Sequence, residues 1–412
     1  MSCYNAPMYQ PSKKILERYA DVMVNFALGK GKGIKKDDVV QVIAYESAKP
    51  LFVEILRAIT KAHGHAITRY MPDSDKSFNI EKDFYLDARD HQIKFFPSKY
   101  YRGLLEETDH SLFIESQADT KSLQGIDPKK IMTKRQAMKP YHEWRDEKEN
   151  RGALSWTLAL YGTPAMAREA GLSERAYWDQ IVRACFLNFA DPVSVWRKVS
   201  KEINALKNRL DELPIEKLHI VGPDADLWIA LRGKRVWRGG GGANIPSFEV
   251  FTSPDWRGTK GWMRFNQPVY VAGNLIKKVE LRFEKGHVVQ SSASVGDKFL
   301  KELIKARNGD KIGEFSLTDK RLSKITKFMA TTLYDENIGG PNGNTHIALG
   351  SSYHDCYRGD PSKPTKNQWA KLGFNDSSVH QDFISTAPRT VTAYLKNGKD
   401  KVMYEEGKFV LD

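Results

Sequence analysis

The first half of the chain alternates strand-like apolar runs with segments of helical period. Val39 to Tyr45 is an apolar, β-prone run, a helix-period segment from Lys49 to His63 follows it, and Ala66 to Tyr70 is again strand-like. This order predicts a βαβ unit, in which parallel strands are covered by helices. The runs at 111–114 and 156–161 extend the predicted sheet.

Helical segments continue up to Pro214, where the pattern changes. A long charged helix is expected from Asp127 to Glu149, with a kink or break at Pro140. Further helices are expected at 164–170, 174–189 and 192–213. Short strands dominate after Pro214, and they are expected at 218–221, 226–231, 236–238, 244–252, 261–265, 269–271, 275–283, 287–292 and 312–317, with a helix at 296–306.

This change of pattern divides the chain into two predicted domains. Residues 1–213 are expected to form an N-terminal α/β domain with a parallel-type sheet and covering helices. Residues 214–412 are expected to form a C-terminal α+β domain that is rich in strands. A length of 412 residues is too great for one ordinary hydrophobic core, which also favours two domains.

The composition favours a globular protein of the cytoplasm. The apolar fraction is 41%, and no uninterrupted apolar run is long enough to cross a bilayer. The N-terminus lacks the basic and then apolar profile of a signal peptide. The three cysteines form neither a disulfide framework nor a CxxC pair, which suits a reducing compartment.

A net charge of +13 raises the question of nucleic acid. The Lys and Arg residues are scattered, however, with Asp and Glu between them, and no RNA-binding fingerprint is present. A solvated basic surface is therefore favoured over a nucleic-acid interface. Attraction of anionic peptides is a secondary use of this charge.

Candidate chemistry concentrates between Asn344 and Asp382. His380 and Asp382 are two residues apart in a short strand-like run, so both side chains leave the same face. His346 lies in a similar run, and Tyr353 follows it after a Gly-Ser-Ser turn. Imidazole and carboxylate that converge on one point are suitable ligands for a divalent transition metal.

Two further carboxylates stand in apolar surroundings. Glu249 is flanked by Phe248 and Val250, and Glu314 by Gly313 and Phe315. An acid embedded in an apolar strand costs several kcal/mol unless it is paired or bound to a cation. Either glutamate alone could equally point to solvent from an edge strand. Their occurrence beside the histidine-containing runs favours a shared site.

Together these residues offer two imidazoles, three carboxylates and a phenol. They are Glu249, Glu314, His346, Tyr353, His380 and Asp382. One catalytic zinc keeps three protein ligands and an open position, so the set is too large for a single ion. It suits two ions that share a carboxylate, lower the pKa of a water and polarise the carbonyl that the water attacks.

The catalytic roles of these residues are less defined by the sequence. Glu249 or Glu314 could accept the proton of the water. A tyrosine is more often a core residue, but Tyr353 could ligate a metal or donate a hydrogen bond to the oxyanion of a tetrahedral intermediate.

The same segments resemble a known family over essentially the whole chain. The matching motifs are Asn244-Ile245-Pro246 through Pro254, Leu281-Arg282-Phe283-Glu284-Lys285-Gly286, Ile312-Gly313-Glu314, Asn344 through Tyr353, Val379-His380-Gln381-Asp382-Phe383, Tyr161 through Ala167, and Pro192 through Trp196. In this combination the chain is similar to the aminopeptidase T / aminopeptidase S family of dinuclear metallo-exopeptidases, first known from thermophilic bacteria.

The resemblance implies a site and an assembly. Glu249, Glu314, His346, Tyr353, His380 and Asp382 correspond to the family's metal ligands, with Glu314 as the bridge. The cofactors would be two divalent metal ions, zinc or cobalt, with magnesium or manganese as alternatives. A homodimer with an enclosed active site would admit short peptides with a free N-terminus. The Gly239–Gly242 run and the 355–376 loop depart from the family pattern, which leaves the substrate preference open.

The sequence therefore predicts a cytoplasmic, metal-dependent aminopeptidase. One alternative is a dinuclear metallohydrolase that acts on another bond, such as a phosphoester. The other is a non-enzymatic basic protein that binds nucleic acid.

Overall fold

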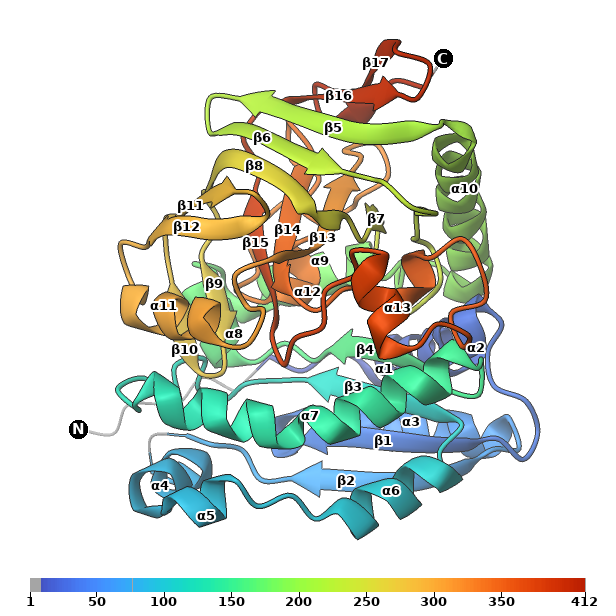
Figure 1. The fold of residues 1–412 in the computed structure, drawn as a ribbon. Helices are drawn as coiled ribbons and strands as arrows, with labels where there is room; N and C mark the ends of the chain where they lie inside the picture. Colours follow the sequence, from blue (N-terminus) through green and yellow to red (C-terminus); the bar gives the residue numbers. More distant parts are fainter. Residues whose placement is uncertain (1–8, 76, 412) are drawn as a thin grey trace.

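The computed structural model describes residues 9–75 and 77–411. Its first sheet has four parallel strands in the order β2-β1-β3-β4, drawn in blue to teal in the lower part of Figure 1. The strands are β1 (Val39–Tyr45), β2 (His65–Met71), β3 (His110–Glu115) and β4 (Ser155–Leu160). The predicted βαβ unit is confirmed, because α3 (Lys49–Lys61) joins the parallel strands β1 and β2.

Helices surround this sheet. They are α1 (Lys13–Val22), α2 (Leu28–Gly31), α4 (Ile80–Asp87), α5 (Asp90–Ile93), α6 (Ser98–Glu107), α7 (Pro128–Asn150), α8 (Pro164–Glu169), α9 (Glu174–Ala184) and α10 (Pro192–Glu212). A π-helical turn, Met23–Ala27, separates α1 from α2. The helices α4, α5 and α6 were not predicted from the sequence.

Of the kink or break expected at Pro140, the break is wrong, and the kink stays a prediction. Pro140 lies inside α7, which continues to Asn150. Proline removes the hydrogen bond to the carbonyl four residues earlier, which belongs to Gln136. Gln136 is exposed, so water can satisfy that carbonyl and the helix continues.

The second half of the chain is largely antiparallel. An eight-stranded sheet has the order β12-β11-β8-β6-β5-β16-β17-β18, and a four-stranded sheet has the order β15-β14-β13-β7. The strands are β5 (Ile215–Gly222), β6 (Ala225–Ala230), β7 (Glu249–Thr252), β8 (Asp255–Phe265), β11 (Val279–Glu284), β12 (His287–Ser292), β13 (Ile312–Thr318), β14 (Asn344–Gly350), β15 (His380–Ser385), β16 (Thr390–Leu395), β17 (Asp400–Glu405) and β18 (Lys408–Phe409). A small hairpin, β9 (Val269–Val271) and β10 (Asn274–Ile276), and the helices α11 (Asp297–Lys305), α12 (Thr332–Asp335) and α13 (Lys366–Lys371) complete it.

Three strand predictions in this half differ from the structure. The run 244–252 is a strand only over Glu249–Thr252. The run 236–238 forms only an isolated bridge between Arg238 and Phe251. The run 275–283 is divided between β10 and β11, since Lys278 adopts a positive φ of 51° that no strand continues through.

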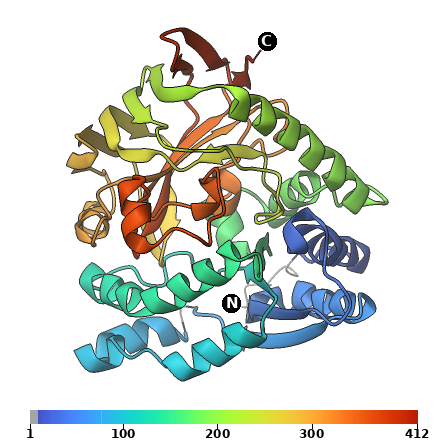
Figure 2. The ribbon, with the colours of Figure 1, turned by 45° about the vertical axis from the view of Figure 1, so that its right-hand side comes forward.

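Each half of the chain contributes to the core of the other. Ile245, Phe248 and Tyr334 pack into the core around the parallel sheet. Ile203 and Leu210 of α10 pack into the core of the antiparallel sheets. In Figure 2, α10 runs along the side of the strand-rich half and down to the parallel-sheet half. The division at residues 213 and 214 stays a prediction, but the two cores are interlocked.

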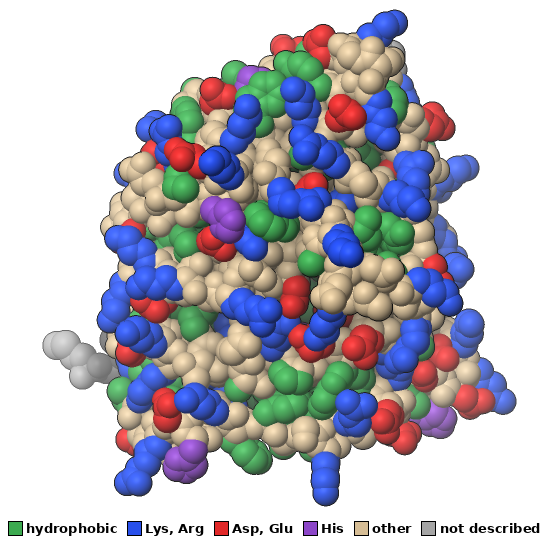
Figure 3. All heavy atoms as spheres, viewed as in Figure 1, with side chains coloured by type: hydrophobic (Ala, Val, Ile, Leu, Met, Phe, Trp, Pro, Cys, Tyr) green, Lys and Arg blue, Asp and Glu red, His purple; other side chains and the backbone are tan. Residues whose placement is uncertain are grey.

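The charged side chains on the surface are scattered, as the sequence predicted. Figure 3 shows Lys and Arg side chains over the whole visible face, with Asp and Glu side chains between them. Within residues 9–75 and 77–411, no helix is long and apolar enough to span a membrane.

Candidate metal centre

The antiparallel register of β13, β14 and β15 brings the predicted site residues to one face of the four-stranded sheet. Glu314 pairs with Ala348, and Ala348 pairs with Asp382. Directly opposed residues share a face, so the two carboxylates flank the small methyl group of Ala348. His346 and His380 lie two residues from members of this row and therefore share its face.

The donor atoms of these side chains converge. His346 Nε2 lies 3.2 Å from Glu249 Oε2 and 3.5 Å from Glu314 Oε1. His380 Nε2 lies 3.1 Å from the other oxygen of Glu314, Oε2, and 3.7 Å from Asp382 Oδ1. Glu314 thus presents one carboxylate oxygen to each imidazole.

Glu249 reaches the cluster from the edge strand β7. β7 pairs with β13, and the Ser316 hydroxyl of β13 donates a 2.7 Å hydrogen bond to Glu249 Oε2. Glu249 is only 5% exposed, so it does not point to solvent as an edge-strand acid could. The apolar neighbours of Glu249 in the sequence, Phe248 and Val250, therefore correctly indicated a buried carboxylate.

Glu336 is a further member that the sequence analysis missed. It follows α12, and a ligand atom of its buried carboxylate lies within 4.8 Å of ligand atoms of His346 and Asp382. Asn244 Nδ2 donates to Glu336 Oε1 over 2.9 Å. The sequence offers one indication of Glu336, because Asp335 and Glu336 are adjacent acids in a segment, 331–338, that is otherwise uncharged. The segment has no periodic pattern, so the sequence does not distinguish a buried acid here from one in a solvated loop.

The donor set fits divalent cations. Three groups have ligand atoms within 4.8 Å of one another, namely Glu249 with Glu314 and His346, Glu314 with His380 and Asp382, and Glu336 with His346 and Asp382. The four carboxylates are at most 14% exposed. Burying so many negative charges together is costly unless cations neutralise them. Imidazole nitrogens and carboxylate oxygens are established ligands of divalent metals.

Protons neutralise this cluster when no cation does. Burial raises the pKa of Glu314, but hydrogen bonds from His346 and His380 outweigh it and lower that pKa to about 2. Burial lowers the pKa of His380, but Glu314 and Asp382 raise it to about 9. The pKa of His346 is likewise raised, against burial, by Glu249 and Glu314. Burial, and then repulsion by Glu249 and Asp382, raises the pKa of Glu336 well above its usual range.

Tyr353 lies beside the cluster. Its ring centroid is 4.8 Å from that of His380, and its backbone N–H donates to Ser253 Oγ over 2.9 Å. Burial, followed by the charges of Glu314 and Asp382, raises the pKa of the phenol well above its usual range. The phenol therefore keeps its proton beside the carboxylates and can donate a hydrogen bond.

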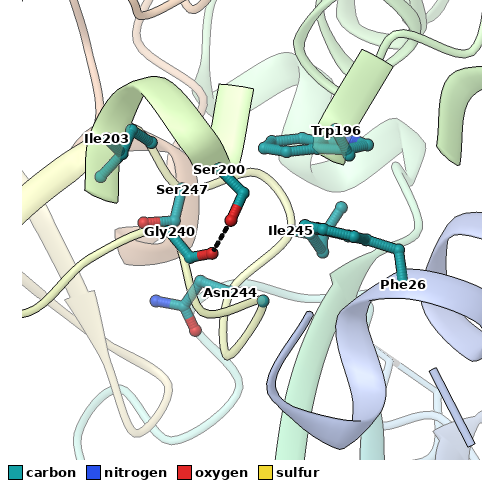
Figure 4. A pocket seen from close by; sticks show the side chains of 9 residues that line it. Phe26, Trp196, Ser200, Ile203, Gly240, Asn244, Ile245 and Ser247 are labelled. Carbon is teal, nitrogen blue, oxygen red and sulfur yellow. Dashed lines mark hydrogen bonds between the residues drawn. The ribbon is translucent and has the colours of Figure 1, made fainter. Parts of the chain in front are cut away.

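The glycine run before Asn244 explains how this segment reaches the cluster. A Cβ on Gly242 would lie 2.5 Å from the carbonyl oxygen of Ala27, so only glycine allows this close approach. The Ser200 hydroxyl of α10 donates to the Gly240 carbonyl over 2.6 Å (Figure 4). The cavity lined by these residues measures about 10 Å³, which is about the room of one water. The run thus packs tightly against α10 and the π-helical turn Met23–Ala27 and fixes the position of Asn244.

The fold and the site together define the class. Clustered carboxylates and imidazoles on one face of an antiparallel sheet are the arrangement of a metal-dependent hydrolase. The family model described as thermophilic metalloprotease (M29) matches residues 12–409. The match covers nearly the whole chain, which therefore belongs to the M29 family of metalloproteases.

Similar proteins agree with this family. The chain is 27% identical to aminopeptidase PepS of Streptococcus thermophilus, over 90% of this chain and 92% of that protein. It is 28% identical to aminopeptidase T of Thermus thermophilus, over 72% and 75% of the two chains, and 29% identical to aminopeptidase AmpS of Bacillus subtilis, over 70% and 73%. The predicted aminopeptidase T/S family is confirmed.

A solved structure confirms the fold. Wild-type AmpT from Thermus thermophilus matches with a TM-score of 0.78 and 23% identity, over 97% of this chain and 99% of that one. An α/β part with a parallel sheet and a strand-rich α+β part were the predicted classes, and both are present.

Proposed function

We propose that this metal-dependent aminopeptidase removes the N-terminal residue of peptides with two divalent cations held by the cluster around Glu314. Family membership and the aminopeptidases among its relatives establish the metal-dependent aminopeptidase. The number of ions, their ligands and the roles of individual residues are the proposal.

The position of Glu314 is the observation that carries the proposal. Its Oε1 faces His346 and its Oε2 faces His380, so one carboxylate serves two groups of ligand atoms. A second observation is the charge, because four carboxylates balance two divalent cations when all are ionised. We assign one ion to Glu249, Glu314 and His346, and the other to Glu314, His380 and Asp382, with Glu336 and Tyr353 completing the surroundings.

The bound cations would supply Lewis acidity, which lowers the pKa of a water and polarises the scissile carbonyl. The chain's own residues hold and move protons around that reaction. Glu249 and Glu314 are the proposed acceptors of the water proton. Tyr353 keeps its phenolic proton, which suits a donor to the oxyanion of the tetrahedral intermediate.

The donor types favour zinc or cobalt over harder ions. Two imidazoles in the set suit zinc and its neighbours in the first transition series. The four carboxylates leave magnesium and manganese as second choices. Competition between zinc and manganese for the metal-free protein, followed by calorimetry, measures this preference.

A cytoplasmic homodimer is part of the proposal. Cys185 and Cys356 are free, buried thiols, which agrees with a reducing compartment. The dimer is supported by the family resemblance of the sequence. Light scattering on the purified protein measures it, and a monomer at micromolar concentration would contradict it.

Chelation and restoration test the activity. The metal-free protein should not hydrolyse aminoacyl anilides, and added zinc or cobalt should restore hydrolysis. A panel of anilides would identify the preferred N-terminal residue. Phosphoester hydrolysis by the metal-loaded protein without anilide hydrolysis would favour the other dinuclear hydrolase. Salt-sensitive binding of RNA that survives chelation, without peptidase activity, would favour the nucleic-acid-binding protein.

A further inference from the structure

An ion pair stands next to the metal cluster. Arg238 Nε lies 3.4 Å from Asp355 Oδ2, and the two side chains are 33% and 47% exposed. Arg238 exchanges backbone hydrogen bonds of 2.7 and 2.9 Å with Phe251, which follows Glu249 by two residues. Asp355 follows Tyr353 by two residues. Both members of the pair are therefore tied by the backbone to members of the cluster.

Partly exposed side chains connect the pair with the cluster. The ring centroid of Phe251 is 5.5 Å from that of Tyr353, and Tyr353 lies 4.8 Å from His380. His380 is itself 25% exposed, so solvent reaches the cluster on this side. A substrate that touches His380 can thus extend along these rings toward Arg238.

Basic and acidic side chains are mixed at this outer end. Burial raises the pKa of Asp355, Arg238 and Lys30 oppose that rise, and Glu314 adds to it. Burial and then Asp355 raise the pKa of Glu149, while Lys30 and Arg145 lower it. Arg145 also acts on Asp146, and Arg238 on Asp211, so charges of both signs are present here.

We propose that Arg238 binds the C-terminal carboxylate of short peptide substrates, and that the enzyme therefore prefers di- and tripeptides. The inference rests on the proposed function, since the N-terminus must be held at the cluster. The rings of Tyr353 and Phe251 join His380 to the backbone partner of Arg238 through centroid distances of 4.8 and 5.5 Å, and an extended chain spans about 3.3–3.6 Å per residue. Two or three residues therefore bridge the cluster and Arg238.

The chemistry of Arg238 suits this role. Guanidinium is the side chain that best matches a carboxylate, because its planar fork donates parallel hydrogen bonds. Its contact with Asp355 is longer than the 2.7–2.9 Å of a charge-assisted hydrogen bond. Asp355 therefore holds the guanidinium loosely, and a substrate carboxylate can compete for it.

The test compares peptides that differ only at the C-terminus. The zinc-loaded enzyme is given a tripeptide with a free carboxylate and the same tripeptide as its amide, with the N-terminal residue chosen from the anilide panel. A hydrogen bond to a charged group predicts a kcat/KM at least about tenfold higher for the acid. The preference should lie mainly in KM and should disappear for peptides of six residues, whose carboxylate lies beyond Arg238.

Three variants separate binding from a structural role. Arg238→Gln should bring the acid-to-amide ratio close to one. Asp355→Asn should raise the ratio above that of the unmodified enzyme, because it frees Arg238, and it carries the test if Arg238→Gln does not fold. Arg282 is the matched control, as an exposed arginine with an acid 3.8 Å away on β11, and Arg282→Gln should leave the ratio unchanged.

A ratio near one in the unmodified enzyme would overturn the inference, as would an undiminished ratio in Arg238→Gln or a lowered one in Asp355→Asn. These results would not contradict the proposed aminopeptidase activity, since the amide would still be cleaved. Failure to cleave peptides and anilides alike would instead overturn the proposed function, and this inference with it.

Discussion

Replacement of Glu314 with glutamine tests whether one carboxylate serves both halves of the cluster. The change keeps the side-chain volume but removes the charge and turns one oxygen into an NH2 group. Because Glu314 Oε1 faces His346 and Oε2 faces His380, an N–H donor replaces an anionic oxygen on one side in either orientation of the amide. The other side keeps an oxygen but loses its charge. Both ions should therefore bind more weakly.

The size of the effect follows from the burial of the site. Glu314 is 4% exposed, so solvent screens its charge little. Removal of one partner from a buried ion pair costs about 3–5 kcal/mol. Each 1.4 kcal/mol is a factor of ten, so the affinity for each ion should fall by roughly two to three and a half orders of magnitude. Glu249 shares a group with His346 but not with His380, so Glu249→Gln should weaken one ion by a similar factor and spare the other.

Metal content and activity are measured together. After dialysis against trace zinc, mass spectrometry should find two ions in the unmodified enzyme, about one in Glu249→Gln and fewer than one in Glu314→Gln. Anilide hydrolysis by Glu314→Gln should be abolished, and circular dichroism checks that the variant is folded. The shared-carboxylate geometry is refuted if Glu314→Gln retains two ions at unchanged affinity or cleaves at the normal rate.

Three further predictions concern pH and packing. In the metal-free protein, His346 and His380 lower the pKa of Glu314 from 4.5 to about 2, and Glu314 and Asp382 raise the pKa of His380 from 6.5 to about 9, in both cases against burial. The contribution of Glu314 to stability is lost as the pH falls from 4.5 toward 2. The contribution of His380 is lost as the pH rises from 6.5 through 9. The Tm of the chelated protein should therefore be highest between pH 4.5 and 6.5, whereas the zinc-loaded protein should not lose stability up to pH 9, and parallel pH profiles of the two forms would contradict this. Zinc binding at pH 7 should release protons, because His380 must lose its proton to ligate a metal, and a calorimetric enthalpy that does not depend on the buffer would exclude such release. A Cβ on Gly313 would lie 2.2 Å from the carbonyl oxygen of Ser351. Gly313→Ala should therefore displace Glu314, reduce the zinc content and lower the free energy of unfolding in urea by about 1–3 kcal/mol. Gly103→Ala, with open space around its Cβ, should change neither the zinc content nor the free energy of unfolding.

The sequence allowed prediction of the parts of the site that follow from local alternation. The spacing of His380 and Asp382 predicts a common face on a strand, and β15 has that geometry. The apolar neighbours of Glu314 predict a buried position, and β13 is buried throughout. The four parallel strands were predictable for the same reason, since βαβ units leave a strong periodic signal.

Features set by tertiary contacts could not be predicted in this way. Glu336 belongs to the cluster because Asn244 and the end of α12 place it there, and neither contact leaves a periodic pattern. Arg238 was assigned to a strand, but its backbone pairs only with Phe251. The register of β13 against β14 and β15 decides which residues meet, and it depends on pairings across the sheet that one sequence does not reveal.

The two halves of the chain meet at the segment that leads to the metal cluster, and this couples metal binding to the stability of the whole molecule. Leu158 of the parallel sheet donates to the carbonyl of Ala243 over 2.9 Å and accepts from Ile245 over 3.1 Å. Asn244, between them, holds Glu336. A ligand that binds only the folded state stabilises it by RT ln(1 + [L]/Kd), which is about 4 kcal/mol at a thousandfold excess over Kd. Because this segment packs in the core of the parallel sheet and also supports the cluster, that stabilisation should extend to β4, and hydrogen exchange of its amides should slow when zinc is added.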